Sequence, residues 1–279
     1  MVVFKIDPPN TGRLGNQLFQ IAATLSHAAN VGDKAQFTNW EYNKYFINPI
    51  DDNLDTTYDC KFANIMHNPL LALQFEYKPL PPEKNVILHG FFQSEKYFID
   101  NIDLIINHFK PKNEFLRVVR DAGAEFLNLQ NTVAMHVRRG DYLSKPDCHP
   151  ALSETDYYQK AILEICKYND FELPLKSRIN FVVFSDDIAW CKANLSVPND
   201  ITTMHFVEGN SDIVDLFLMA QCKNHIIANS SFSWWAAWLA KNLFFHNQYG
   251  LTIAPKTWFG PSLSHYNTND LLPNDWIKI

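Results

Sequence analysis

Three short apolar segments in the second half of this chain each run directly into a polar loop. They occupy residues 132–137, 181–184 and 226–228, and the sequence between them has the apolar spacing of helices. Strands that alternate with helices form a parallel sheet with helices on both faces. Such sheets bind ligands beyond the carboxyl ends of their strands. We therefore predict a doubly wound α/β sheet whose three polar loops gather at one edge.

The N-terminus shows the same succession of strand, loop and helix. Residues 2–6 have the composition of a short buried strand, residues 8–16 form a loop with glycine and asparagine, and residues 17–30 have helical spacing. A chain of 279 residues accommodates two domains of ordinary size. We expect an N-terminal lobe over residues 1–130 and a C-terminal lobe over residues 131–279.

The composition predicts a folded protein that does not bind anionic polymers through its overall charge. Hydrophobic residues make up 47% of the chain and charged residues 19%, which is enough apolar material for a buried core. The 24 Lys and Arg residues against 30 Asp and Glu residues give a net charge of −6. This excess of acidic groups argues against binding to nucleic acid or to an anionic membrane surface. An anionic substrate would need a local basic site.

The cysteines and the apolar segments bear on the location of the protein. The five cysteines are scattered, without a CxxC pair or a His at zinc-ligand spacing, so we expect reduced thiols. The apolar stretch in the N-terminal sequence MVVFKIDPPN is shorter than a signal peptide requires, and no apolar segment of membrane-spanning length follows. We expect a cytoplasmic protein without an integral membrane segment, peripheral at most to the inner face of a membrane. The catalytic domain of a Golgi enzyme without its anchor would share these features.

The first polar loop, residues 136–141, reads HVRRGD. Side chains alternate along a strand, so His136 and Arg138 point to one side and reach the same site. A guanidinium binds phosphate oxygens through two parallel bonds and keeps its charge, so Arg138 and Arg139 can stabilise a departing diphosphate without a metal ion. The alternative is a surface ion pair between Arg139 and Asp141 beside a histidine with no role in catalysis.

The second polar loop contains Ser185, Asp186 and Asp187, and three roles are open for it. Adjacent carboxylates can hold magnesium or manganese against a diphosphate. Ser185 or Asp186 can instead cap the helix that we expect over residues 188–195. A carboxylate can also accept hydrogen bonds from both N1–H and N2–H of guanine in a planar pair.

The third polar loop, residues 229–235, reads NSSFSWW and runs into a helix. Free backbone N–H groups and hydroxyls at a helix N-terminus form an anion site. The alternative is a serine cap followed by aromatic residues packed in the core, which we prefer for Trp235 and Trp238. The candidates for substrate contact in this loop are Ser230, Ser231, Phe232, Ser233 and Trp234.

A fourth candidate is the glycine loop near the N-terminus, which reads GRLGNQLFQ from Gly12 to Gln20. It lacks the third glycine and the acidic residue of a dinucleotide-binding fingerprint, so it matches an NAD site weakly. A glycine turn that exposes Gly15, Asn16 and Gln17 to a substrate is the simpler explanation.

In combination these segments resemble the α-1,2-fucosyltransferases of glycosyltransferase family 11. The resemblance extends over nearly the whole chain and keeps the order of the motifs. It is carried by residues 12–22, 90–98, 136–141, 185–187 and 229–235, with a similar tail over residues 255–276. Two positions depart from the family pattern: Arg13 stands in place of a glycine, and Phe92 stands where tyrosine is frequent.

The resemblance implies an α/β fold of the GT-B type, in which two Rossmann-like lobes face each other across a cleft. The C-terminal lobe then holds GDP-fucose and the N-terminal lobe supplies the acceptor side. The implied reaction is the inverting transfer of L-fucose from GDP-β-L-fucose to the 2-hydroxyl of a terminal galactose on a glycan. It requires no metal and no other cofactor. The implied partners are GDP-fucose and the galactose-terminated glycan.

The resemblance also implies roles for single residues. Arg138 contacts the β-phosphate and stabilises the leaving GDP, while His136 and one of Asp186 or Asp187 read guanine. The serines of the third loop line the diphosphate or the fucose, and the asparagine and glutamine of the glycine loop lie near donor and acceptor. Asp141 is the candidate base, and its position is equally consistent with a role in orienting Arg139.

Three other functions remain open from the sequence. One is a transferase for another GDP-sugar. Another is a metal-dependent GT-A transferase in which Asp186 and Asp187 bind the cation. The last is a non-catalytic carbohydrate-binding protein, because 21 Phe, 11 Tyr and 7 Trp residues offer surfaces on which sugars stack. A lectin would not need the HVRRGD loop.

Overall fold

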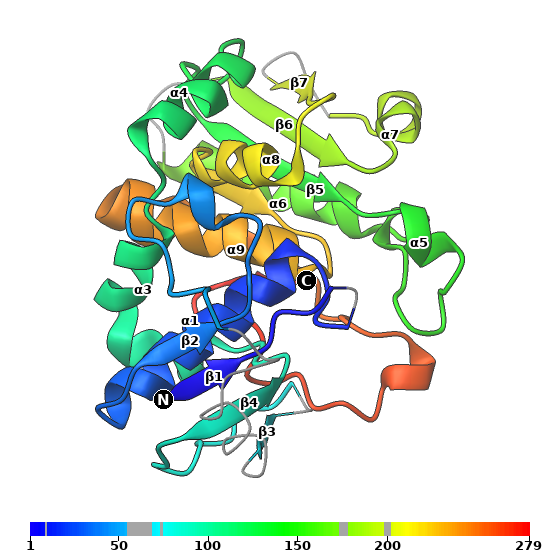
Figure 1. Cartoon of the computed structure of the whole chain (residues 1–279). Helices are drawn as coiled ribbons and strands as arrows, with labels where there is room; N and C mark the ends of the chain where they lie inside the picture. The colour runs from blue at the N-terminus through cyan, green and yellow to red at the C-terminus, as the bar shows by residue number, and fades with distance from the viewer. Residues whose placement is uncertain (9, 55–68, 73–74, 173–177, 198–201) are drawn as a thin grey trace. The chain divides into compact units, whose positions relative to one another are not determined.

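The computed structural model describes residues 1–8, 10–54, 69–72, 75–172, 178–197 and 202–279 (Figure 1). The chain forms two compact units. The first unit comprises Met1–Phe115 and Tyr266–Pro273, and the second comprises Leu116–His265 and Asn274–Ile279.

The second unit is built on a six-stranded sheet with the strand order β10-β9-β8-β5-β6-β7. Each neighbouring pair of strands runs parallel. The strands are β5 (Thr132–Val137), β6 (Ile179–Ser185), β7 (Thr202–Phe206), β8 (Asn224–Ile226), β9 (Thr252–Ala254) and β10 (Ile277–Lys278). The helices are α5 (Gly140–Leu143), α6 (Tyr157–Glu172), α7 (Ile188–Asn194), α8 (Asp212–Ala220) and α9 (Ser231–Leu239). Short 3-10 turns are η4 (Leu152–Glu154), η6 (His246–Gln248) and η7 (Pro261–Leu263), and η5 (Ala240–Phe245) is a π-helix that follows α9. The predicted parallel α/β sheet is confirmed.

Alternation along β5 decides which side chains reach the polar edge of this sheet. Val133, Met135 and Val137 pack in one hydrophobic cluster with residues of α6. Their neighbours in the strand point to the opposite face, and His136 accordingly lies beside α9 through its contact with Ser233. Figure 1 shows the central strands between α6 and α8. The apolar alternation therefore buries one face of β5 and leaves His136 on the other.

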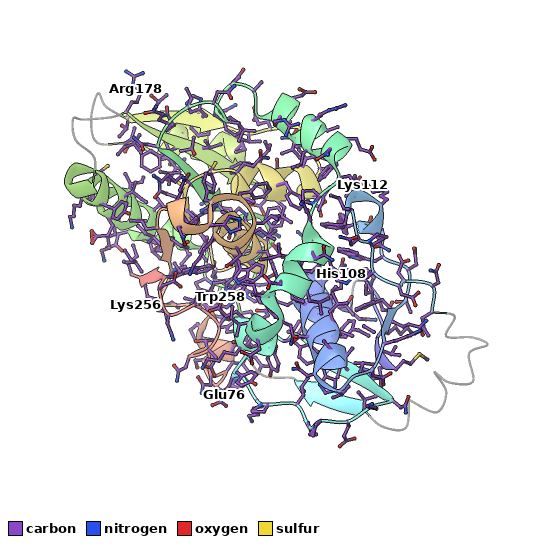
Figure 2. The ribbon with its side chains drawn as sticks, turned by 90° about the vertical axis from the view of Figure 1, so that its left-hand side faces the viewer. Glu76, His108, Lys112, Arg178, Lys256 and Trp258 are labelled. Atoms are coloured by element: carbon purple, nitrogen blue, oxygen red, sulfur yellow. The ribbon has the colours of Figure 1, made fainter. Side chains whose placement is uncertain are left out.

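The first unit contains a four-stranded parallel sheet with the order β2-β1-β4-β3. Its strands are β1 (Val2–Phe4), β2 (Ala35–Phe37), β3 (Pro69–Ala72) and β4 (Val86–Gly90). Its helices are α1 (Leu14–Asn30), α3 (Ile102–Phe109) and the start of α4 (Asn113–Ala122), with short turns η1 (Asn43–Tyr45), η2 (Glu95–Tyr97) and η3 (Ile99–Asn101). His108, labelled in Figure 2, belongs to α3, and its Nδ1 lies 2.9 Å from the carbonyl oxygen of Asn48.

Helix α1 begins at Leu14, three residues earlier than the sequence predicts. Gly12 has a φ of +78°, a conformation that other residues rarely adopt, and this turn ends at Arg13, the N-cap. Gly15 is buried in the first turn of the helix. The glycine loop therefore serves to turn the chain sharply from strand to helix.

The division between the units falls at residues 115 and 116, within α4, and not at 130 and 131 as expected. Phe115 packs on Tyr45 of the first unit with ring centroids 4.6 Å apart. At Gly123 the chain already lies against Leu218 of the second unit, because a Cβ there would come within 2.6 Å of that side chain. The chain also returns to the first unit at residues 266–273. Tyr266 packs edge-on against Phe75, with ring centroids 5.2 Å apart.

Two further expectations concern the membrane and the cysteines. No helix in the described part of the chain combines the length and the apolar character that crossing a bilayer requires. Among the described cysteines, Cys148, Cys191 and Cys222 form no disulfide with one another. Cys60 lies outside the described residues.

Candidate active site

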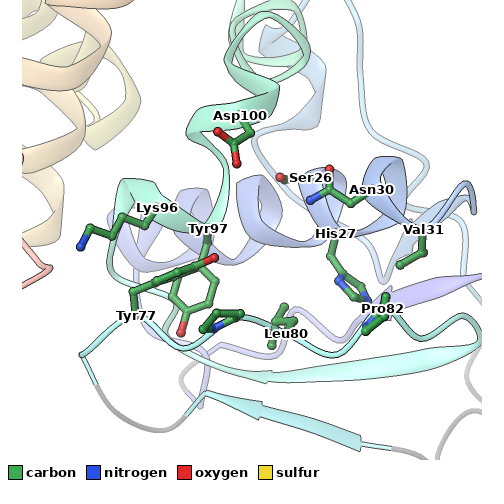
Figure 3. Close-up of a pocket in the computed structure, with 11 residues that line it drawn as sticks. Ser26, His27, Asn30, Val31, Tyr77, Leu80, Pro82, Lys96, Tyr97 and Asp100 are labelled. Carbon is green, nitrogen blue, oxygen red and sulfur yellow. The ribbon is translucent and has the colours of Figure 1, made fainter.

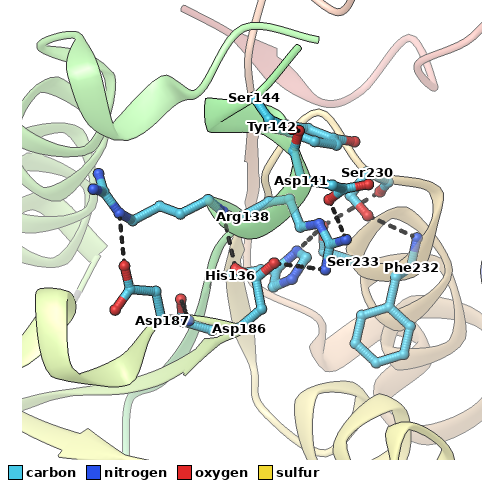
Figure 4. A network of polar contacts seen from close by, with 12 residues as sticks. His136, Arg138, Asp141, Tyr142, Ser144, Asp186, Asp187, Ser230, Phe232 and Ser233 are labelled. Carbon is cyan, nitrogen blue, oxygen red and sulfur yellow. Dashed lines mark hydrogen bonds and ion pairs between the residues drawn. The ribbon is translucent and has the colours of Figure 1, made fainter. Parts of the chain in front are cut away.

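The polar loops that follow β5, β6 and β8 meet at one edge of the second-unit sheet. β5 lies between β8 and β6, and the three strands run in the same direction, so their carboxyl ends point to the same edge. Figure 4 shows the polar contacts that join the loops. His136 Nδ1 lies 2.9 Å from Ser233 Oγ, and the Arg139 N–H donates to Asp186 Oδ1 at 2.9 Å. The predicted gathering of the three loops is confirmed.

His136 is a neutral histidine at the end of β5. Only 6% of its surface is exposed, and Phe232 packs edge-on against it with ring centroids 5.6 Å apart. Burial lowers the pKa of His136 to about 4, and the positive charge of Arg138 acts in the same direction. Nδ1 is engaged by Ser233, whereas Nε2 makes no hydrogen bond with any described residue. Nε2 is therefore the ring atom available to a ligand.

Arg138 holds two carboxylates at once (Figure 4). Nη1 lies 2.8 Å from Asp186 Oδ2, and Nη2 pairs with Asp141 Oδ1. The guanidinium also lies over the ring of Tyr142, with Cζ 5.5 Å from the ring centroid. The Asp141 side chain is 51% exposed and that of Asp186 is 25% exposed, so Asp141 is the partner that a ligand can displace more easily. The alternative pairing of Asp141 with the second arginine is wrong.

Arg139 is engaged within the second unit through its Nε, its Nη1 and the face of its guanidinium. Its Nε donates to Asp187 Oδ2 at 3.1 Å, and its Nη1 donates to Glu154 Oε1 at 2.6 Å and to Ser153 Oγ at 2.7 Å. The guanidinium stacks on Trp190, with Cζ 4.0 Å from the ring centroid. Only 8% of Arg139 is exposed. These contacts fix the loop and occupy two of the three guanidinium nitrogens of the side chain that we expected to bind substrate.

The two carboxylates of the second loop have different tasks. Asp187 is the N-cap of α7, and its Oδ1 accepts from the Trp190 N–H at 3.1 Å. The prediction of a cap at Ser185 or Asp186 is wrong, because the capping residue directly precedes Ile188, the first residue of the helix. Asp186 instead accepts one bond on each oxygen from the two arginines of the first loop. It ties β6 to the HVRRGD segment.

Gly140 permits the close approach of these two loops. A Cβ at this position would overlap Asp186 Oδ2. Any side chain larger than hydrogen would therefore push Asp186 away from Arg138. Gly140 was not among the predicted site residues, although a glycine inside a charged loop is the signal that points to such an approach.

The third loop supplies a serine cap. Ser230 is the N-cap of α9, and its Oγ accepts from the Phe232 N–H at 3.4 Å. Ser233 Oγ donates to the carbonyl oxygen of Ser230 at 3.4 Å and contacts the histidine of the first loop. Ser231 is the first residue of the helix and is half-buried. The helix N-terminus and the serines thus lie beside His136.

The aromatic residues of the third loop belong to the core. Trp234, which we predicted to contact substrate, has no exposed surface and packs against Trp276 with ring centroids 5.5 Å apart. Trp235 and Trp238 are 0% and 1% exposed, and their ring centroids lie 5.2 Å apart. The core alternative is confirmed for both, and it holds for Trp234 as well.

Two positions near the site were not predicted from the sequence. The Tyr142 hydroxyl donates to the carbonyl oxygen of Asn229 at 2.9 Å, and the Tyr142 ring stacks on His149 with centroids 5.0 Å apart. Asn229 Nδ2 donates to the carbonyl oxygens of Pro150 and Trp258, both at 3.1 Å. Asn229 therefore joins the segment after β8 to two further loops. No spacing rule reveals such a role before the tertiary contacts are known.

The positive charge of the HVRRGD loop is balanced without a ligand. Its two arginines are paired with four carboxylates, namely those of Asp141, Glu154, Asp186 and Asp187. A diphosphate that contacts Arg138 competes for this positive charge with Asp141 and Asp186. Among the described residues, no group of three or more His, Cys, Asp or Glu side chains is placed to hold a metal ion.

In the first unit the two amide side chains of the glycine loop differ in burial. Asn16 is half-buried, and its Oδ1 accepts from Gln93 Nε2 at 2.9 Å. Gln17 is 2% exposed; its Nε2 donates to the Gly12 carbonyl at 2.9 Å and its Oε1 accepts from Trp40 Nε1 at 3.0 Å. We expected both residues to face a substrate. The structure uses both ends of the Gln17 amide inside the unit, so Gln17 does not face a substrate.

Comparison with known proteins gives three results. The sequence model described as Glycosyl transferase family 11 matches residues 4–279. An α-1,2-colitosyltransferase from Escherichia coli is 33% identical over 96% of this chain and 96% of its own length. A galactoside 2-α-L-fucosyltransferase from Bos taurus is 27% identical over 82% of this chain and 62% of its own length. A solved structure of NodZ α-1,6-fucosyltransferase soaked with GDP-fucose has a TM-score of 0.51 at 16% identity, over 85% of this chain and 92% of that chain. At this identity the structural match is a likeness of fold alone.

Proposed function

This chain belongs to glycosyltransferase family 11, and from that membership we propose that it is an α-1,2-fucosyltransferase that uses GDP-β-L-fucose. It is a glycosyltransferase with a GT-B fold. The proposed acceptor is the 2-hydroxyl of a terminal galactose on a glycan, and the transfer inverts the anomeric carbon. The proposal is supported by the fucosyltransferase named among the relatives. The observation that carries it is the Arg138 guanidinium, held at the end of the central strand beside a neutral histidine and a helix N-terminus.

The proposed chemistry centres on the leaving diphosphate. The acceptor hydroxyl attacks in line, the anomeric C–O bond to the β-phosphate breaks, and negative charge develops on GDP. Arg138 stabilises that charge by exchanging its exposed partner Asp141 for phosphate oxygens while Asp186 keeps hold of the guanidinium. Asp141, released from its ion pair, is then the candidate base for the acceptor proton.

Guanine recognition is assigned to His136 and Asp186. Asp187 is committed to the cap of α7 and to Arg139, which leaves Asp186 as the carboxylate for guanine. Each oxygen of Asp186 accepts one bond from the first loop, and a carboxylate has about four lone-pair sites, so each oxygen keeps one for N1–H or N2–H. His136 adds the unengaged Nε2 of a neutral ring.

The N-terminus of α9 is proposed to meet the diphosphate or the fucose. Ser230, Ser231 and Ser233 lie there, and the helix end carries partial positive charge. We further propose that the second unit binds the donor without a metal ion and that the first unit contributes to the acceptor side through Asn16.

A second candidate donor is favoured by one comparison. The E. coli relative that matches almost the whole chain is named as an α-1,2-colitosyltransferase. Colitose is fucose without its 3-hydroxyl, so the two donors differ by one hydrogen-bonding group. A site built to bind that hydroxyl discriminates strongly against the deoxy sugar, whereas an apolar site discriminates weakly.

The test is a transfer assay with the full chain, lactose as acceptor, and GDP-fucose or GDP-colitose as donor. Product formation with GDP-fucose and an NMR coupling pattern of an α-1,2 linkage are expected. Transfer from GDP-colitose alone would replace the proposed donor by the second candidate. Absence of transfer from both, together with no binding of GDP in calorimetry, would refute the proposal and favour a carbohydrate-binding protein.

A further inference from the structure

The first unit contains a cavity of about 130 Å³, shown in Figure 3. Its walls come from the last turns of α1, the segment 77–82, and the turns η2 and η3. None of its lining residues belongs to the site described above. An apolar cavity of about 150 Å³ holds benzene, so this space is the size of one six-membered ring.

One wall of the cavity is aromatic and apolar. The rings of Tyr77 and Tyr97 meet edge to face with centroids 4.9 Å apart. Tyr97 is 8% exposed, and its hydroxyl accepts from the Lys78 N–H at 3.2 Å, which fixes the ring. Leu80 and two prolines, Pro79 and Pro82, continue this wall. Such a surface packs against the C–H face of a ring and offers it few hydrogen bonds.

The opposite side presents hydrogen-bonding groups of two solvent-exposed residues, Asn30 and Asp100. Asn30 Oδ1 accepts from Asn101 Nδ2 at 2.8 Å, which orients the amide so that its own Nδ2 remains a donor. The Asp100 carboxylate makes no hydrogen bond or ion pair with any described residue. In Figure 3 the side chains of Asp100 and Asn30 flank the same space.

His27 contributes an acceptor. Its Nε2 lies 3.1 Å from the carbonyl oxygen of Glu83, which can only accept, so Nε2 carries the proton and Nδ1 is the acceptor. Burial lowers the pKa of His27, so the ring is neutral near pH 7. The cavity therefore combines a charged acceptor, a neutral acceptor and an amide donor opposite an aromatic wall.

This combination selects among classes of ligand. An anion would need a free cation, but the ammonium group of Lys96 is paired with Asp270 and His27 is neutral. A metal ion would need several ligands, and the described residues provide no such cluster. Hydroxyl groups can both donate to Asp100 and accept from Asn30, and a pyranose ring has an apolar C–H face. The chemistry fits a neutral sugar.

We propose that this cavity is a binding subsite for one neutral pyranose ring of a saccharide. This proposal rests on the proposed function in one respect, because we take the saccharide to be the acceptor glycan. The bound ring is then a sugar of that glycan other than its terminal galactose. Occupation of the subsite would favour longer acceptors over short ones.

Calorimetry of the full chain without donor tests the proposal. The probes are lactose and a linear galactose-terminated tetrasaccharide. We expect the tetrasaccharide to bind more tightly than lactose, and Asp100→Ala to weaken tetrasaccharide binding about tenfold, because a hydrogen bond to a charged group is lost. Lactose binding should be unchanged. The matched control is Asp103→Ala, which removes an exposed carboxylate of the following helix that lies outside the cavity and should have no effect.

Kinetics give a second measurement that a general loss of structure would not reproduce. Asp100→Ala should raise KM for the tetrasaccharide by a similar factor and leave kcat and the KM for lactose unchanged. Equal weakening of both acceptors, or unchanged tetrasaccharide binding, would overturn the proposal. If GDP does not bind while Asp100→Ala still weakens tetrasaccharide binding, the proposed transferase function fails and the subsite stands.

Discussion

Replacing Arg138 with lysine should reduce turnover by about two orders of magnitude although the positive charge is kept. The guanidinium places two nitrogens on two different carboxylates, Nη1 on Asp186 at 2.8 Å and Nη2 on Asp141. A lysine ammonium is a compact point charge and cannot span both positions. It can stay with the less exposed Asp186 or meet the diphosphate, so one donor to the developing charge is lost. Loss of such a donor costs about 3 kcal/mol, which is about 150-fold in rate.

The assay compares initial rates at saturating GDP-fucose and lactose, with the affinity for GDP measured by calorimetry. Arg178→Lys is the matched control, because Arg178 is an exposed arginine of the second unit (Figure 2) and should tolerate the same change. Circular dichroism and Tm establish that both variants are folded. A kcat for Arg138→Lys within a few-fold of the wild type would refute the role of the bidentate guanidinium.

Three more outcomes test the site. Transfer should persist in excess EDTA, because the first loop, and not a bound cation, neutralises the diphosphate; complete loss of activity that manganese restores would instead support the metal-dependent alternative. Asp186→Ala should raise KM for GDP-fucose more than it lowers kcat, since guanine is bound equally in the ground and transition states. Asp187→Ala should mainly lower Tm, because it removes a helix cap worth about 1 kcal/mol. An unchanged KM for GDP-fucose in both variants would show that other residues bind guanine. His136 has a pKa of about 4 in the folded chain, below its ordinary value of 6.5. Between these pH values the unfolded chain binds a proton that the folded chain does not. The free energy of unfolding therefore falls as the pH drops through this window. His136→Gln should reduce that fall in Tm, and an unchanged profile would show that His136 is not buried as a neutral ring.

The central strand could be predicted because both of its faces are buried. Every residue of β5 is buried, and the apolar run 132–137 matches the strand to the residue. Strand β8 covers residues 224–226, so it begins and ends two residues earlier than the apolar run 226–228. Residues 227 and 228 are buried like the residues of the strand, although the strand has already ended. Burial alone does not mark where a ladder stops. The edge strand β10 consists of only two residues, both exposed, so no apolar run in the sequence indicates it.

The types of residue in the site could be predicted, but their pairing could not. Arg138, Arg139 and Asp141 are close in sequence, and spacing does not decide which arginine the carboxylate meets. The answer depends on Trp190 and on Glu154, which come from other segments and draw Arg139 to the far side of the loop. Contacts of this kind are set by the sheet order, which brings β6 beside β5.

The return of residues 266–273 to the first unit has a consequence for synthesis on the ribosome. Asp270 accepts a hydrogen bond from the Tyr77 N–H at 3.0 Å and pairs with Lys96, and Asn267 donates to Glu76 at 3.0 Å. These partners are translated long before residues 266–273 emerge. At about 5–20 residues per second, the 174 to 193 residues that separate these partners in the sequence take about 9–39 s. During that interval the nascent N-terminal part lacks its final segment, so a stop codon before Tyr266 would leave both the first unit and the sheet edge at β10 incomplete.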